Sequence, residues 1–118
     1  MLRRMGDYAY ALAPTIQVDQ HLEVDLVHQE VRLDGESVGL TPTETKILYI
    51  LLRNAGRVVS TDFLLRRIWP LEDAYAEALR VHIHRLRQKL DMYSRGHLYI
   101  LTERGLGYRF VTADRQHT

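Results

Sequence analysis

The spacing of hydrophobic residues changes twice along this chain, and the order of those changes limits the folds open to it. In residues 22–40 apolar and polar side chains alternate, which is typical of half-buried strands. In residues 42–92 apolar side chains recur at helical intervals, and β-rich runs return in residues 98–111. The sequence therefore predicts an α+β fold with a small antiparallel sheet first, three helices next and a hairpin last.

Local signals place the ends of these elements. Asp34-Gly35 predicts a hairpin turn in the first sheet. Thr41-Pro42-Thr43-Glu44 has the residues and spacing of a capping box at a helix start. Ser60 is a good cap for a second helix that Pro70 ends, and Val58-Val59 before it is interpreted as a short extended link.

The length of 118 residues fits one domain with short tails. Residues 1–20 show no sustained period and are interpreted as a linker or tail, residues 21–112 as the domain, and residues 113–118 as a C-terminal tail. The chain has no cysteine, which excludes disulfides and thiolate metal sites. Its longest apolar run, residues 47–52, is far too short to span a membrane, and we expect a cytoplasmic protein.

Charge is distributed unevenly although the formal net charge is only +1. Residues 19–39 hold one arginine and six acidic residues, and residues 78–110 hold seven basic and two acidic residues. The basic segment predicts an attraction for a polyanion such as nucleic acid. Two oppositely charged, solvated surfaces would give the same pattern, so charge alone does not decide between these interpretations.

The third predicted helix, roughly residues 77–92, combines an apolar seam with arginine-rich outer faces. The seam consists of residues at steps of four, three and four: Leu79, Ile83, Leu86 and Leu90. The remaining faces carry two rows, which are Arg80, His84 and Arg87, and Val81, Arg85 and Gln88. An arginine can bind guanine O6 and N7 with two hydrogen bonds or clamp a phosphate, and Val81 can meet a thymine methyl group.

The last two β-rich runs are joined by Arg104-Gly105-Leu106-Gly107, whose glycines permit positive φ. A hairpin tipped by Arg104 can enter a minor groove while Thr102 and Tyr108 donate hydrogen bonds to phosphates. The alternative is an edge hairpin whose charges only prevent aggregation. The combination of this hairpin with the basic helix favours nucleic-acid binding.

Three separated motifs, in the right order, resemble the OmpR/PhoB-type effector domains of bacterial response regulators. Arg80–Leu90 looks like the recognition helix of that family, Leu40–Glu44 like the start of its first helix, and Thr102–Phe110 like its wing. The resemblance covers roughly residues 20–112. It implies a winged helix-turn-helix preceded by a four-stranded antiparallel sheet, which binds direct-repeat DNA sites as a head-to-tail dimer and regulates transcription.

The resemblance also implies roles for individual residues. The residues of this helix that we expect to contact DNA combine those implied by the resemblance with the basic and polar residues outside the apolar seam. They are Arg80, Val81, His82, His84, Arg85, Arg87, Gln88 and Lys89. The predicted contacts from the wing and to the DNA backbone are Trp69, Thr102, Arg104 and Tyr108. The loop predicted to meet RNA polymerase contains Leu71, Glu72, Asp73, Ala74 and Tyr75.

The chain departs from the family pattern at two places. An Arg-Thr pair often opens the family's recognition helix, where this chain has Glu77-Ala78, and an acid often stands where it has Arg80. The absence of the Arg-Thr pair removes expected phosphate contacts, and Arg80 can restore one of them. Leu2-Arg3-Arg4 resembles the end of a receiver domain's last helix. We therefore expect the phosphorylatable receiver domain and the sensor kinase to lie outside this chain.

Other functions have weaker support in the sequence. His82 and His84 point about 200° apart on a helix, so a metal site is not expected. The sequence shows no paired nucleophile and base and no cofactor motif, so neither catalysis nor a cofactor is expected. Trp69 is interpreted as a core side chain and Tyr75 as a loop side chain rather than as stacking platforms. The main alternative is a winged-helix module whose basic face docks on an acidic protein.

Overall fold

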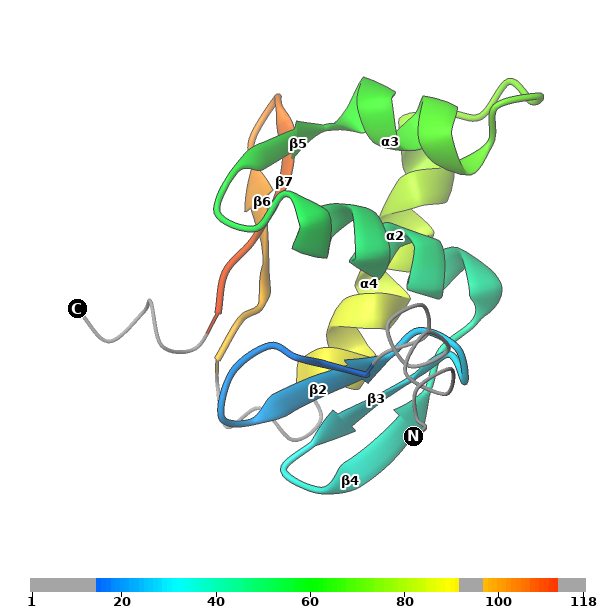
Figure 1. The fold of residues 1–118 in the computed structure, drawn as a ribbon. Coiled ribbons are helices and arrows are strands. Elements are labelled where there is room, and N and C mark those ends of the chain that lie inside the picture. The colour runs from blue at the N-terminus through cyan, green and yellow to red at the C-terminus, as the bar shows by residue number, and fades with distance from the viewer. Residues whose placement is uncertain (1–14, 92–96, 113–118) are drawn as a thin grey trace, which may run out of the picture.

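The computed structural model describes residues 15–91 and 97–112, which form three helices and two small sheets (Figure 1). The first sheet, called sheet A, contains four antiparallel strands: β1 (Thr15–Gln17), β2 (Leu22–Asp25), β3 (Glu30–Leu33) and β4 (Glu36–Gly39). The helices are α2 (Pro42–Arg53), α3 (Thr61–Ile68) and α4 (Ala76–Asp91). The second sheet, called sheet B, contains β5 (Val58–Ser60), β6 (Ile100–Glu103) and β7 (Gly107–Phe110). The predicted fold class is confirmed.

Sheet A has the strand order β1-β2-β3-β4 and buries one of its two faces. The alternation of side chains along the strands decides which face is buried. Val24 pairs with Val31 on the buried face, where both are fully buried, whereas Glu23 pairs with Arg32 on the other face. The predicted turn at Asp34-Gly35 is confirmed, with both residues at positive φ.

The N-terminal boundary of the domain lies earlier than the sequence suggested. Residues 1–20 were expected to be a linker or tail, but Thr15–Gln17 pairs with β2 as an edge strand. Asp19 is buried, and its carboxylate accepts hydrogen bonds from the backbone N–H groups of His21 and Leu22. A strand of three residues is too short for its alternation of exposed and partly buried side chains to be recognised in the sequence. The receiver-like residues 2–4 and the predicted tail 113–118 lie outside the described residues.

The helix starts follow the local signals closely. Thr41 caps α2 by accepting a hydrogen bond from the Glu44 backbone N–H, and the Glu44 side chain accepts one from the Thr41 N–H in return. Asn54 caps the C-terminus of α2, and Gly56 follows with φ at 86°. Ser60 caps α3 by accepting from the Phe63 N–H. Both predicted starts are confirmed.

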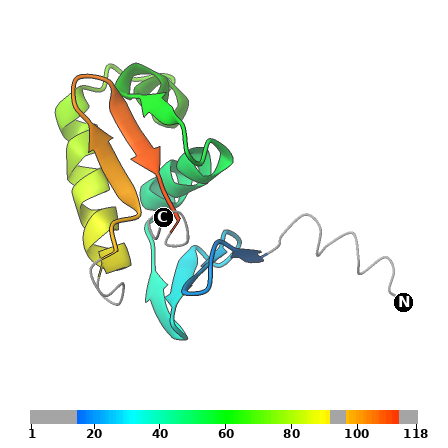
Figure 2. The same ribbon diagram turned by 90° about the vertical axis from the view of Figure 1, so that its left-hand side faces the viewer.

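The predicted seam of α4 joins a single hydrophobic core. Its four residues are all buried: Leu79, Ile83, Leu86 and Leu90. They share this core with side chains from sheet A, α2, α3 and sheet B. Figures 1 and 2 show α4 running beside sheet B at one end and reaching sheet A at the other. None of the helices in the described residues is long and apolar enough to cross a membrane.

Sheet B is larger than the predicted hairpin. Val58-Val59, expected to be a simple link, forms β5 and pairs with β7, giving the order β5-β7-β6 (Figure 2). Gly105 lies at the turn with φ at 75°, as the sequence predicted. Glycine is required at position 107 for a different reason, because an added Cβ would collide with the Val59 carbonyl oxygen. Glycine at 107 therefore allows the close approach of β5 and β7.

Candidate nucleic-acid interface

The outward face of α4 lies opposite its buried seam and is rich in basic and polar side chains. Its exposed members from the predicted set are Arg80, Val81, His84, Arg85 and Gln88. Arg80, Val81, His84 and Arg85 line one open surface hollow, together with Glu77. Glu77 was not in the predicted set, although its position one helical turn before Val81 places it on the same face. The face has the composition needed to meet base edges and phosphates.

Three arginines near this face have no competing interaction within the protein. Arg80, Arg85 and Arg104 are exposed, and within residues 15–91 and 97–112 none of them makes a hydrogen bond or an ion pair. An exposed guanidinium without a partner keeps all five of its N–H donors for another molecule. These side chains therefore present positive charge that no group in the described part of the chain neutralises.

The hairpin of β6 and β7, with the turn between them, is called the wing. Its turn is held against the start of α3, because the Leu106 carbonyl oxygen accepts a hydrogen bond from the Thr61 N–H at 3.1 Å. Thr102 and Arg104 are exposed, as a role in binding requires. Tyr108 is only 8% exposed and packs in the core, so most of its ring is unavailable to a ligand. The wing therefore offers a basic tip on an anchored turn.

Arg87 is placed differently from the other arginines of α4. Its Nε donates to the Ile100 carbonyl oxygen at 3.0 Å, and its Nη2 donates to Thr102 Oγ1. Its guanidinium carbon also lies 5.7 Å from the centre of the Tyr108 ring, within the range of a cation–π interaction. The side chain is half-buried and joins α4 to both strands of the wing.

Lys89 does not belong to the outward face, and its predicted DNA contact needs correction. Its Nζ lies 2.6 Å from Oε1 of Glu44, whose side chain is almost completely buried at the start of α2. Burial opposes the ionisation of Glu44, but hydrogen bonds from Lys89 and from the Thr41 backbone outweigh it and lower the pKa of the carboxyl group. Sequence proximity to Arg87 was misleading, because Lys89 lies on the opposite flank of the helix.

His82 and Trp69 form a half-buried pair between α4 and the end of α3. Their ring centres are 5.7 Å apart, and Trp69 packs against the core. The Nδ1 atom of His82 is buried and has no hydrogen-bond partner among the described residues. The interpretation of Trp69 as a core side chain is confirmed, and neither ring belongs to the exposed basic face.

The loop between α3 and α4 projects away from the molecule, at the end of α3 that is remote from β5 and the wing (Figure 1). Leu71 is 95% exposed and Tyr75 is 74% exposed, which confirms Tyr75 as a loop side chain. Glu72 and Asp73 are exposed and Ala74 is half-buried. The loop therefore presents two acids and two large apolar side chains to solvent.

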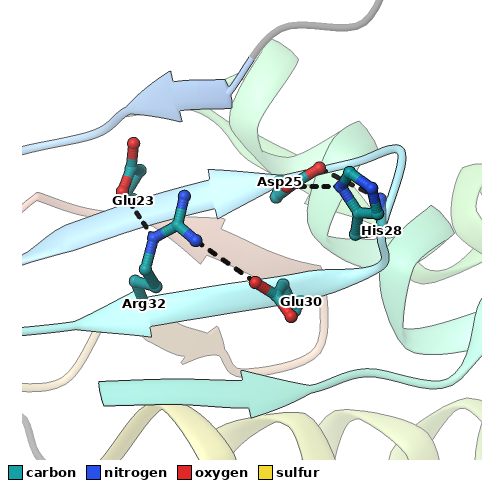
Figure 3. A network of polar contacts seen from close by, with 5 residues as sticks. All are labelled: Glu23, Asp25, His28, Glu30 and Arg32. Carbon is teal, nitrogen blue, oxygen red and sulfur yellow. Dashed lines mark hydrogen bonds and ion pairs between the residues drawn. The ribbon is translucent and has the colours of Figure 1, made fainter. Parts of the chain in front are cut away.

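The outer face of sheet A carries charges that are paired with one another (Figure 3). Arg32 contacts Glu23 at 2.9 Å and Glu30 at 3.3 Å. These partners, led by the hydrogen bond to Glu23, raise the pKa of Arg32 above its ordinary value. Hydrogen bonds from the backbone and ring of His28 lower the pKa of Asp25. Within the described part of the chain, no group of three or more potential ligands could hold a metal ion.

Comparison with known proteins adds to this geometry. Residues 35–110 match the family model described as "Transcriptional regulatory protein, C terminal". The chain is 41% identical over 110 residues to the transcriptional regulatory protein KdpE of Mycobacterium tuberculosis, covering 92% of this chain and 48% of that protein. It thus spans about half the length of this curated relative.

Two solved structures are similar in fold and sequence. The DNA-binding domain of CpxR from Escherichia coli matches with a TM-score of 0.71 and 36% identity, covering 86% of this chain and 99% of that one. The DNA-binding domain of RstA from Klebsiella pneumoniae, solved in complex with the RstA box, matches with a TM-score of 0.68 and 31% identity. That match covers 82% of this chain and 96% of the other.

Proposed function

The chain belongs to the family of C-terminal domains of transcriptional regulatory proteins, and from this premise we propose that it binds double-stranded DNA sequence-specifically and regulates transcription. The observation that carries the proposal is the set of exposed arginines on α4 and the wing that have no partner among the described residues. The DNA-binding domains of CpxR and RstA share this fold, and RstA was solved with its DNA box.

The geometry supports a division of labour between α4 and the wing. Placed in a major groove, the outward face of α4 brings Arg85 and Val81 to base edges, where Arg85 can bind guanine and Val81 a thymine methyl group. Arg80 lies beside them and can reach a phosphate. Arg104 at the wing tip can enter a narrow minor groove, where the negative potential is enhanced.

The proposed set of DNA contacts is smaller than the sequence suggested. The ion pair of Lys89 with Glu44 argues against a DNA contact by Lys89. Arg109, which contributes to the basic charge of this segment, is paired with Glu103 at 2.7 Å. Arg80, Arg85 and Arg104 remain as the principal cations, with His84 and Gln88 as polar neighbours on α4. Thr102 remains on the wing, and His82, Trp69 and Tyr108 can contribute only the edges that their packing leaves exposed.

The resemblance to OmpR/PhoB-type effector domains supports a more specific role. We place the domain as the output part of a two-component response regulator in the cytoplasm, with a receiver domain and a sensor kinase as partners. On a direct-repeat site, two copies would bind head to tail. The exposed loop of residues 71–75 is the candidate contact for RNA polymerase, because it lies at the end of α3 that is remote from β5 and the wing.

The test of the proposed function is selection of binding sites from random duplexes, followed by affinity measurement on a selected and a scrambled duplex. We expect a recurring motif and binding at least about a thousandfold tighter to the selected site, as is usual for specific recognition. Equal affinity for both duplexes would contradict sequence-specific recognition. Absence of binding to any duplex, with capture of an acidic protein by the same face, would favour the interaction module instead.

A further inference from the structure

Arg87 is the one arginine among those predicted to contact DNA whose guanidinium is already engaged within the described structure. The Nε and Nη2 groups form one edge of the guanidinium, and both of them donate to β6. This edge is one of the two with which an arginine can bind a guanine through paired hydrogen bonds. The ring of Tyr108 lies against the guanidinium as well.

These contacts connect the two elements that are proposed to meet DNA. Ile100 and Thr102 lie on β6 and Tyr108 on β7, so one side chain of α4 contacts both strands of the wing. The wing is held from its other side by β5 and by the hydrogen bond from Thr61 to Leu106. Arg87 therefore supplies contacts between α4 and the two strands that carry the turn with Arg104.

We infer that Arg87 is a positioning residue, which fixes the wing relative to α4 and affects DNA binding through Arg104 rather than by reading bases. The inference rests on the proposed function of the domain. A wing held at a fixed distance from α4 can enter one groove while α4 occupies the next, without the entropic cost of ordering it on binding. Arg87 would thus preorganise the two contact surfaces as a unit.

A double-mutant cycle separates positioning from direct contact. Arg87→Lys keeps the positive charge but loses the planar fork that bonds two acceptors and lies against the Tyr108 ring. We expect Arg104→Ala to weaken binding to the selected duplex about tenfold and Arg87→Lys severalfold. If Arg87 acts through the wing, the double variant should be no more than about twofold weaker than Arg104→Ala alone.

Arg85→Lys supplies the matched control, because it is the same substitution on the same helix at an arginine that has no partner within residues 15–91 and 97–112. Its effect should multiply with that of Arg104→Ala. If the unmodified protein binds the selected duplex but the effects of Arg87→Lys and Arg104→Ala on affinity multiply, the positioning role is overturned and the proposed function stays intact. Failure of the unmodified protein to bind any duplex would overturn the proposed function and this inference with it.

A measurement on the unmodified protein covers the case in which Arg87→Lys does not fold. The Nε–H of Arg87 is hydrogen-bonded to a backbone carbonyl, so this proton should exchange slowly with solvent and its NMR signal should be observable. We expect that signal to stay in place when the selected duplex is added, while the Arg85 Nε–H signal shifts. A large shift of the Arg87 signal on binding would show that the guanidinium leaves the wing for DNA, and would contradict the inference.

Discussion

Sheet A and the face formed by α4 and the wing are both densely charged, but they use their charges differently. On sheet A, Arg32 lies between Glu23 and Glu30, and each partner is within 3.3 Å. On α4 and the wing, Arg80, Arg85 and Arg104 have no partner among the described residues. The pairing of charged side chains with one another, more than their number, therefore distinguishes a solvated surface from a binding surface.

The same distinction applies within the basic segment itself. Lys89 and Arg109 are neutralised by Glu44 and Glu103, and Arg87 is hydrogen-bonded to the wing. Their charges contribute to the composition of the segment, but the protein uses them to hold its own elements together.

The largest effect is expected for Lys89→Ala, which leaves the buried Glu44 carboxylate without its cation. Because Lys89 is 27% exposed, we expect a loss of about 2–3 kcal/mol in the free energy of unfolding, less than for a fully buried pair. Denaturant unfolding measures it, and Lys46→Ala on the exposed side of α2 is the control, with an expected change within about 0.5 kcal/mol. A stable Lys89→Ala protein with impaired DNA binding would place Lys89 at the DNA after all.

Protonation of Glu44 should have the same consequence as loss of its partner. Its pKa is lowered in the folded state, so its contribution to stability is complete above the pKa of an unfolded glutamate, about 4.3. That contribution should decline as the pH falls from this value through the folded-state pKa. Lys89→Ala should therefore show a weaker loss of stability with acid than the unmodified protein does, and an identical acid dependence would contradict the assigned pair.

The next effect concerns the two exposed arginines. Arg85→Ala should cost about 1–3 kcal/mol of binding free energy on the selected duplex and much less on a random one. Arg104→Ala should weaken both by similar factors, because the minor groove offers few base-specific partners. Fluorescence anisotropy titrations measure both variants, with melting temperature as the check on folding. Unfolding caused by Arg85→Ala would mean that its guanidinium is structural and that the recognition face is rotated.

The exposed loop should separate binding from output. Replacing Glu72 and Asp73 together with alanine should leave DNA affinity unchanged within about twofold and alter transcription from a responsive promoter. The reason is that Glu72 and Asp73 are exposed and their loop lies at the end of α3 that is remote from the wing. Loss of DNA binding in this double variant would show that the loop lies at the DNA.

The smallest effect is expected on sheet A. Arg32→Gln removes the shared partner of Glu23 and Glu30, but all three side chains are partly exposed, so the melting temperature should change little. DNA affinity should not fall. A loss of affinity comparable to that of Arg85→Ala would contradict the assignment of sheet A as a solvated surface.

Local and non-local interactions explain which features could be predicted from the sequence. The capping box of Thr41 and Glu44 and the seam from Leu79 to Leu90 depend on residues within a few positions of each other, and both were predicted. β1 was missed because its strand character comes from pairing with β2. The partner of Lys89 lies 45 positions away and those of Arg87 lie 13 and 15 away, so no local pattern reveals them.

The central claim is that DNA meets the outward face of α4 and the wing. Amide NMR shifts during titration with a duplex carrying a single copy of the selected repeat test it most directly, since one bound molecule avoids contacts between copies. We predict the largest shifts at Arg80, Val81, Arg85 and Arg104, with Arg32 and its neighbours on sheet A unchanged. Shifts concentrated on sheet A, or an absence of shifts on α4 and the wing, would contradict the claim.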